Sequence, residues 1–239
     1  MNAVLDLARR LTVHTGFHMG LIALAVNVGL LIAHTPARAQ TPLVQKPVKI
    51  VAFGDSLSAG YQLAPNEAFP VVLAKALVAR GHSIEMINAG VSGDTTAAGR
   101  DRLTWSVPPD TDAVILELGA NDALRALDPK GTRANLDAII TTLKAQKADV
   151  LLAGMLAPRS LGDTYTSAFD AIYPDLAARH GLLLYPFFID KIALNPKLNL
   201  ADGLHPNAKG VDAIVAGILP KVEELIARVK ARRADAAKG

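Results

Sequence analysis

The apolar positions of this chain fall into two kinds of segment that alternate. Short continuous apolar runs, typical of strands buried on both faces, occur within residues 48–53, 83–90, 112–122, 149–156 and 182–188. Longer amphipathic stretches with helical periodicity occupy residues 68–80, 95–107, 132–147, 165–180 and about 207–232. Strands that alternate with helices predict βαβ units. We therefore expect an α/β fold, a three-layer α/β/α sandwich around a five-stranded parallel sheet.

Polar residues suited to chemistry come directly after the predicted strands. Ser56 follows the first strand, Gly93 the second and Asn121 the third. The stretch ADGLHPN at 201–207 comes after the fifth. In a parallel sheet the ligand site lies outside the carboxyl ends of the strands. The pattern therefore predicts that these four segments meet at one edge of the sheet.

Composition narrows the classes of function. The chain has 239 residues, 51% of them hydrophobic, which suits one globular domain with a substantial core. We expect Trp105 and the remaining aromatic residues in that core. The formal net charge of +3 is scattered along the sequence, so we expect no nucleic-acid partner. The absence of cysteine excludes disulfides, thiolate metal sites and a cysteine nucleophile.

The N-terminal residues are patterned as an export signal. A charged start precedes an apolar run at 19–32, and the sequence ARA at 37–39 fits a small-x-small cleavage site. The apolar run is shorter than the roughly 20 residues that span a bilayer. We predict a signal peptide over 1–39, cut after Ala39, and a periplasmic or secreted mature chain. The alternative is an uncleaved signal that anchors the chain in the inner membrane.

Domain boundaries follow from the same pattern. A short lead-in linker with two prolines is expected at 40–47, one domain at 48–232 and a flexible, charged tail at 233–239. No internal repeat divides the chain, which favours a single domain over a repeat array.

Ser56 stands in the stretch FGDSLSAGY, which has two interpretations. Gly, Asp and Ser favour tight turns for backbone reasons alone, whereas a nucleophilic serine needs a base. Three of the six histidines lie in the predicted signal segment, and His82 and His180 at helix ends suggest surface positions, which leaves His205. Asp202, three residues earlier, is spaced to orient the imidazole, although DGLHPN also suits an ordinary loop and helix cap.

A site for acyl transfer also needs hydrogen-bond donors for an oxyanion. Gly93 lies in a loop where a bare backbone N–H can approach a ligand, and Asn121 places a side-chain amide after a strand. A glycine needed for positive φ and an asparagine in an Asx-turn are the structural alternatives. Four such segments that all follow strands favour the catalytic interpretation.

The blocks GDSL, GVSGDT, GAND and DGLHPN resemble the four motif blocks of the SGNH hydrolases, also called the GDSL family. The stretches GDSLSAGY, VSGDT, ELGANDALR, AFDAIYPDLA and PFF are similar to its bacterial multifunctional thioesterase I, lysophospholipase L1 and arylesterase branch. The resemblance covers residues 48–228 and implies a flavodoxin-like sheet. In agreement, the serine lacks the G-x-S-x-G pattern of the larger α/β-hydrolase fold.

The resemblance implies a role for each residue singled out above. Ser56 would be the nucleophile, His205 the general base and Asp202 its orienting acid. The oxyanion would be bound by the backbone N–H groups of Ser56 and Gly93 and by the side-chain amide of Asn121. The implied reaction is hydrolysis of small-molecule carboxylic esters and thioesters through an acyl-enzyme, without a metal or an organic cofactor.

Two loops, 121–129 and 156–165, are expected to shape the substrate site. Leu124, Leu156 and Leu161 would line an apolar acyl pocket, unless these leucines only anchor the loops to the core. Apolar loops around a site also fit transient contact with membrane lipid. The oligomeric state has no signal in the sequence.

Other functions fit parts of the pattern. A sugar or cell-wall glycan O-deacetylase on the same fold would need polar and aromatic loops, and these loops are rich in leucine. A non-catalytic, membrane-anchored binding protein would have no need for an intact serine, histidine and aspartate. A phosphate-binding loop at GDSLSAG lacks the G-K-[ST] ending.

Overall fold

The computed structural model describes residues 46–238. Its sheet has five parallel strands in the order β2-β1-β3-β4-β5. The strands are β1 (Val48–Gly54), β2 (Ile84–Gly90), β3 (Ala113–Glu117), β4 (Asp149–Ala153) and β5 (Leu183–Tyr185). The predicted five-stranded parallel sheet is confirmed. The predicted signal peptide and the cut after Ala39 lie outside the described residues.

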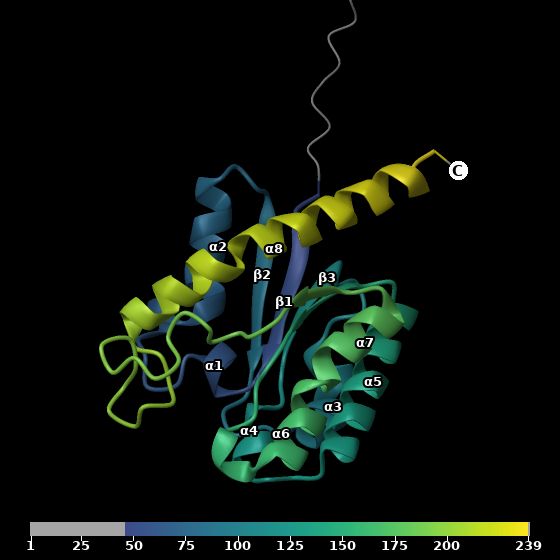
Figure 1. Ribbon diagram of the computed structural model, residues 1–239. Coiled ribbons are helices and arrows are strands. Elements are labelled where there is room, and N and C mark those ends of the chain that lie inside the picture. The colour runs from purple at the N-terminus through teal and green to yellow at the C-terminus, as the bar shows by residue number, and fades with distance from the viewer. Residues whose placement is uncertain (1–45, 239) are drawn as a thin grey trace, which may run out of the picture. The chain divides into compact units, whose positions relative to one another are not determined.

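Helices cover both faces of the sheet (Figure 1). They are α1 (Ser56–Ala59), α2 (Phe69–Ala79), α3 (Thr96–Ser106), α4 (Ala120–Leu124), α5 (Pro129–Ala145), α6 (Asp163–Asp170), α7 (Ile172–His180) and α8 (Ala208–Ala236), with short 3-10 turns η1 (Pro65–Glu67) and η2 (Arg159–Leu161). Helices α2 and α8 pack on one face, and α3, α5 and α7 on the other, which gives the predicted three layers. None of the helices within 46–238 combines the length and apolarity that a bilayer crossing requires.

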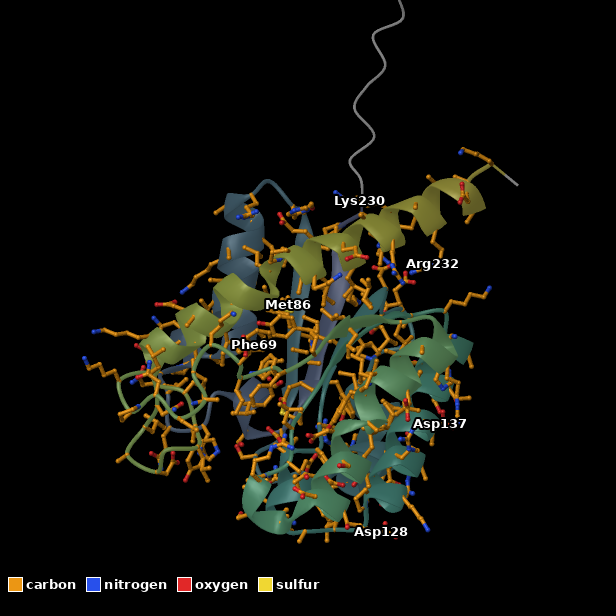
Figure 2. All side chains as sticks on the ribbon, viewed as in Figure 1. Phe69, Met86, Asp128, Asp137, Lys230 and Arg232 are labelled. Atoms are coloured by element: carbon orange, nitrogen blue, oxygen red, sulfur yellow. The ribbon has the colours of Figure 1, made fainter. Side chains whose placement is uncertain are left out.

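The sheet forms the centre of the core because its strands are apolar on both faces. In β1, the side chains of Ile50, Val51 and Phe53 are fully buried. Burial of each such side chain stabilises the folded state by roughly 1.5–3 kcal/mol relative to an exposed one. Phe69 of α2 and Met86 of β2 lie in the layer between the helices and the sheet (Figure 2). The apolar strands predicted from sequence are thus the inner layer of the sandwich.

One predicted helix is two helices in the structure. The helix expected over 165–180 is divided into α6 and α7, which meet at Ala171. Pro174 explains the division, because it has no N–H to donate to the carbonyl of Asp170 and its ring crowds that carbonyl.

Two further predictions are corrected. Helix α8 continues to Ala236, so the tail predicted to be flexible from residue 233 begins as helix, and Arg233 is bound to the carboxylate of Asp112. Trp105, expected in the core, is 79% exposed. It lies one turn after Asp101, which is also exposed, so both share the solvent face of α3.

The chain changes its direction of winding at β1, because β2 lies on one side of it and β3 on the other. In sheets of this order the ligand site lies outside the carboxyl ends of the strands, at this switch point. Ser56 begins the helix after β1, and Asn121 lies in α4 directly after β3. In Figure 1, α1 and α4 both lie at this carboxyl edge of the sheet.

Candidate active site

The turn after β1 presents Ser56 at the start of a short helix. Asp55 caps this helix, because its carboxylate accepts the backbone N–H of Leu57 at 3.0 Å. Gly54, the last residue of β1, has no room for a Cβ atom, which would run into the side chain of Glu117. The turn therefore holds Ser56, which is 9% exposed, in one position.

Two carboxyl groups are buried beside this turn. One oxygen of Glu117 accepts the hydroxyl of Ser58 at 2.8 Å and the backbone N–H of Asp55 at 3.3 Å. The other oxygen of Glu117 has no hydrogen-bond partner among the described residues. Burial raises the pKa of Asp55 to about 6 and raises the pKa of Glu117 well above its ordinary value. Carboxyl groups perturbed in this way are typical of functional sites.

Three side chains from two distant segments form one hydrogen-bonded line. His205 Nε2 lies 2.9 Å from Ser56 Oγ, and His205 Nδ1 lies 2.7 Å from Asp202 Oδ2. The other oxygen of Asp202 accepts the backbone N–H groups of His205 and Leu204 at 3.0 and 2.9 Å. These hydrogen bonds lower the pKa of Asp202 to about 2, so it is ionised at neutral pH. With Nδ1 held by a carboxylate, Nε2 can accept a proton from the serine.

Tyr61 contacts His205, and no sequence pattern predicted this contact. The centres of the two rings are 4.4 Å apart, and their planes are tilted by 38°. The Tyr61 hydroxyl accepts a hydrogen bond from the side-chain amide of Gln62 at 3.0 Å. An aromatic face favours a nearby cation, so the tyrosine restricts the imidazole and supports the charge that it gains on protonation.

The predicted oxyanion donors differ in their hydrogen bonds. Within residues 46–238 no backbone carbonyl accepts from the N–H of Ser56 or of Gly93, and Gly93 has a φ of +87°. The side-chain nitrogen of Asn121 lies 3.0 Å from Asp55 Oδ2 and 3.0 Å from the carbonyl oxygen of Asp94. Both amide hydrogens therefore have acceptors. An oxyanion at Asn121 would share one of these hydrogens or displace one acceptor.

Asp122 fixes the short helix that carries Asn121. It is buried, and its carboxylate accepts the backbone N–H and the hydroxyl of Thr96 at 2.8 and 2.6 Å. It also accepts the hydroxyl of Thr132 at 3.1 Å. These contacts join α4 to the first turns of α3 and α5, so the position of Asn121 is set by three helices.

The leucines predicted to meet the substrate lie in segments that follow strands β3 and β4, with unequal exposure. Leu124 is 53% exposed and Leu156 41%, whereas Leu161 in η2 is half-buried. Other large apolar side chains exposed in loops that follow strands are those of Tyr61, Val91, Leu127, Leu194 and Leu204. The edge that holds Ser56 therefore carries several exposed apolar side chains.

The two remaining described histidines are partly buried, not surface residues as predicted. His82 Nε2 lies 3.1 Å from Glu223, and His180 Nε2 lies 2.6 Å from Asp137. Each imidazole is covered because it pairs with a carboxylate of a neighbouring helix. His82 follows the carboxyl end of α2 and His180 is the last residue of α7; both helices run back along the sheet, so these histidines lie at the edge opposite to Ser56.

Comparison with known proteins gives consistent matches. Residues 52–213 match the GDSL-like lipase/acylhydrolase family. An arylesterase of Vibrio mimicus is 39% identical over 163 residues, which are 68% of this chain and 82% of the relative. The thioesterase 1/protease 1/lysophospholipase L1 of Escherichia coli (strain K12) is 34% identical over 178 residues, 74% of this chain and 84% of the relative. The crystal structure of AlinE4, an SGNH-hydrolase family esterase, has 44% sequence identity and a TM-score of 0.64, and covers 75% of this chain and 96% of its own.

These matches cover the segments of the carboxyl edge. The matched range begins inside β1 and ends within α8, so it contains Ser56, Gly93, Asn121, Asp202 and His205. The five-stranded parallel sheet agrees with the fold of the solved SGNH hydrolase. The chain belongs to the GDSL-like lipase/acylhydrolase family.

Proposed function

We propose that this chain is a serine hydrolase that cleaves carboxylic ester and thioester bonds through an acyl-enzyme. The observation that carries the proposal is the line from Asp202 through His205 to Ser56, with contacts of 2.7 and 2.9 Å. The names of two relatives, an arylesterase and a thioesterase/lysophospholipase, support the type of bond cleaved. Lysophospholipid and aryl-ester substrates belong to the same proposal.

In the first step, Ser56 Oγ attacks the substrate carbonyl while His205 Nε2 takes its proton. Asp202 is ionised and holds Nδ1, so its negative charge stabilises the imidazolium that forms. His205 then gives the proton to the leaving alcohol or thiol, and the acyl group stays on Ser56. In the second step His205 activates a water molecule, which releases the acid and restores the serine hydroxyl.

The tetrahedral intermediates carry an oxyanion, which we assign to the N–H groups of Ser56 and Gly93 and the side-chain amide of Asn121. The two backbone donors support this assignment because no backbone carbonyl among residues 46–238 occupies them. Asn121 supports it through its location, since its amide hydrogen bonds to Asp55, the residue before the nucleophile. Donors fixed before the reaction stabilise the developing charge without reorganisation.

The acyl chain would lie against the loops that follow β3 and β4. Leu124 and Leu156 are exposed and available for this contact, and Leu161 contributes from a half-buried position. The further exposed apolar residues Tyr61 and Leu204 neighbour His205, so the same edge would also accept transient contact with the surface of a lipid aggregate.

We also propose that the chain is exported to the periplasm or the medium, on the evidence of the signal-like residues 1–39. Mass spectrometry of the N-terminus in periplasmic and membrane fractions tests this. A chain that starts at Gln40 in the periplasmic fraction supports cleavage. A membrane-bound chain that retains residues 1–39 would replace cleavage with the anchored alternative.

A chain-length series of p-nitrophenyl esters, from acetate to palmitate, tests the proposed chemistry. We expect activity that peaks above acetate and disappears in Ser56→Ala, followed by activity on acyl-CoA and lysophospholipid of matching length. Activity on acetate alone would favour a deacetylase. A folded protein without activity on any ester would contradict the proposal.

A further inference from the structure

Arg102 is a buried cation close to the proposed site, and the mechanism above does not use it. It lies in the second turn of α3 and is 8% exposed. Its Nε lies 2.5 Å from Asp94 Oδ2. Its two terminal nitrogens donate to the carbonyl oxygens of Ala89 at 2.9 Å and Gly54 at 2.8 Å. Its guanidinium carbon lies 4.2 Å from the centre of the Phe53 ring.

These contacts compensate the cost of burying the charge, which is high without a counter-ion and hydrogen bonds. The guanidinium is planar and reaches three acceptors and a ring face at fixed angles, which the point charge of a lysine cannot reproduce. Stability alone does not need such an arrangement, because apolar side chains of similar volume are often equally stabilising. The residues that accept hydrogen bonds from Arg102 therefore indicate what the buried arginine does.

The two carbonyl acceptors belong to β1, which leads to the nucleophile, and to β2, which leads to the loop that carries Gly93. We call this loop, residues 91–95, the oxyanion loop. Gly54 is the last residue of β1 and stands two positions before Ser56. Its carbonyl oxygen also accepts the N–H of Val91, the first residue of the loop after β2, at 3.0 Å. Arg102 thus holds the nucleophile turn and the start of the oxyanion loop at one carbonyl oxygen.

The other acceptor, Asp94, lies at the end of that loop and follows Gly93 directly. While its carboxylate binds Arg102, its backbone carbonyl accepts the side-chain amide of Asn121 at 3.0 Å. A shift of Asp94 would therefore move Gly93 and redirect the amide of Asn121. Through one guanidinium, the segments of all three assigned oxyanion donors are connected.

We infer that Arg102 is a positioning residue, which fixes the oxyanion donors relative to one another and so sets how tightly the tetrahedral intermediate is bound. The inference rests on the proposed function. Its physical basis is that donors act through preorganised geometry, and a misplacement of about 1 Å can cost about 10²-fold in rate.

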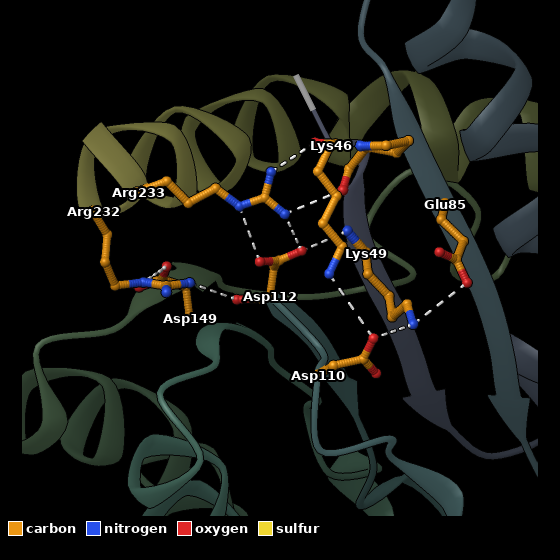
Figure 3. A network of polar contacts seen from close by, with 9 residues as sticks. Lys46, Lys49, Glu85, Asp110, Asp112, Asp149, Arg232 and Arg233 are labelled. Carbon is orange, nitrogen blue, oxygen red and sulfur yellow. Dashed lines mark hydrogen bonds and ion pairs between the residues drawn. The ribbon is translucent and has the colours of Figure 1, made fainter. Parts of the chain in front are cut away.

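Arg233 of α8 provides a matched control at the opposite edge of the sheet (Figure 3). Its Nε and one terminal nitrogen contact the carboxylate of Asp112 at 3.1 and 2.5 Å. Its terminal nitrogens donate to the carbonyl oxygens of Lys46 and Pro47 at 2.7 and 3.1 Å. Like Arg102, Arg233 joins one aspartate to two carbonyl oxygens, but Asp112 stands before β3, at the end away from the proposed site.

The test compares Arg102→Lys and Arg233→Lys in the full chain. We would measure Tm, kcat and KM on the preferred p-nitrophenyl ester, and inhibition by an alkyl boronic acid, which forms a tetrahedral adduct with a nucleophilic serine. For Arg102→Lys we expect kcat to fall about 10- to 100-fold, inhibition to weaken by a similar factor, and KM to stay within about threefold. For Arg233→Lys we expect a lower Tm, with kcat and inhibition within about twofold of wild type.

Equal kcat values in the two variants, with Tm lowered in both, would give Arg102 a purely structural role and overturn the inference. A higher KM with unchanged kcat would also overturn it, because that pattern reports ground-state binding. A folded wild-type protein that neither hydrolyses esters nor binds the boronic acid would overturn the proposed function instead.

If Arg102→Lys does not fold, Asp94→Asn tests the same contact, because the amide keeps a hydrogen-bond acceptor and removes the charge. We expect kcat to fall by about 3- to 30-fold, since charge-assisted hydrogen bonds are roughly twice as strong as neutral ones. Asn121→Ala should then cost less in the Asp94→Asn background than in wild type, because the two changes act on one set of donors. An unchanged kcat in Asp94→Asn, or fully additive losses, would overturn the inference.

Discussion

Strands β1 and β3 lie side by side, and their two ends hold carboxyl groups in opposite environments. At the amino end, Asp110 accepts a hydrogen bond from Lys49 at 2.6 Å, which holds the pKa of that carboxyl below its ordinary value. At the carboxyl end, Asp55 and Glu117 lie together in the interior, and burial raises the pKa of both. The same pair of strands presents a carboxylate paired with a cation at one end and buried carboxyl groups with raised pKa values at the other.

The amino end forms a network in which cations and carboxylates alternate (Figure 3). There, Arg232 pairs with Asp149 and Arg233 with Asp112. At the carboxyl end, by contrast, one oxygen of Glu117 is buried without a partner among the described residues. Perturbed groups of this kind cost stability and persist mainly where they serve chemistry. We infer that the amino end holds the fold together and that the carboxyl end serves the reaction.

The sharpest test of this division is Ser56→Ala. We expect kcat to fall by at least about 10⁴-fold, because a triad acts as a unit and the nucleophile cannot be replaced. The Tm should change by only a few degrees, since the lost group is one hydroxyl bound to His205. Ester hydrolysis and a thermal unfolding scan on the same sample give both values. Residual activity above about one hundredth of wild type would contradict the assignment of the nucleophile.

The next effect in size is expected for Asn121→Ala, with a loss of about 10²–10³ in kcat. The change removes one proposed oxyanion donor and also the amide that binds Asp55 and Asp94. KM should stay within about threefold, because the oxyanion exists only in the intermediate. Steady-state kinetics on the preferred ester decide the matter. A kcat within threefold of wild type would exclude Asn121 from the oxyanion site.

The fold and the pairing of Asp202 with His205 were accessible from sequence because both depend on local patterns, whereas Ser56 was assigned through its position after a strand and through the family motif blocks. Apolar runs and helical periodicity identify the strands and helices. The three-residue spacing of Asp202 and His205 predicted that they share one turn, and their 2.7 Å contact agrees. The predicted helix boundaries were wrong where a single residue interrupts a helix, as Pro174 in the first turn of α7 divides the helix predicted over 165–180.

The groups that sequence did not reveal depend on contacts between distant segments. In the sequence, Arg102 is an ordinary arginine of a predicted helix. It is a buried cation only because the folded chain places the ends of β1 and β2 against its side chain. Glu117 ends an apolar strand, and its burial against Ser58 follows from the register of β1 and β3. Trp105 shows the converse, since hydrophobicity alone assigned it to the core and the orientation of α3 exposes it.

Asp112→Ala examines the amino end directly. The change would leave Arg233 without its counter-ion and the backbone N–H of Lys49 without its 2.8 Å acceptor. We expect the free energy of unfolding to fall by roughly 2–4 kcal/mol, because a broken pair that is partly buried leaves unpaired groups behind. Urea denaturation measures the loss, and kcat at 25 °C should stay within about twofold. A tenfold loss of kcat in folded protein would break the division between the two ends.

The smallest expected effect is a pH dependence of stability that originates at the carboxyl end. The pKa of Asp55 is about 6 in the folded chain, against its ordinary value of 3.8 in the unfolded one. Between these pH values Asp55 keeps its proton in the folded chain and has lost it in the unfolded chain. The free energy of unfolding should therefore fall as pH rises through this window. The size of the fall is roughly 1–3 kcal/mol.

Asp55→Asn separates this contribution from the rest of the molecule. An asparagine keeps an oxygen that can accept the N–H of Leu57, but an NH2 group replaces the oxygen that accepts from the amide of Asn121. Because this side chain has no proton to bind, the stability of the variant should vary less between pH 4 and 6. Asp110→Asn is the matched change at the amino end, where the pKa is lowered and stability is lost as pH falls, below this window. Parallel curves for wild type and Asp55→Asn would mean that Asp55 is compensated as well as the carboxylates of the amino end, and the contrast between the two ends would then rest on Glu117 alone.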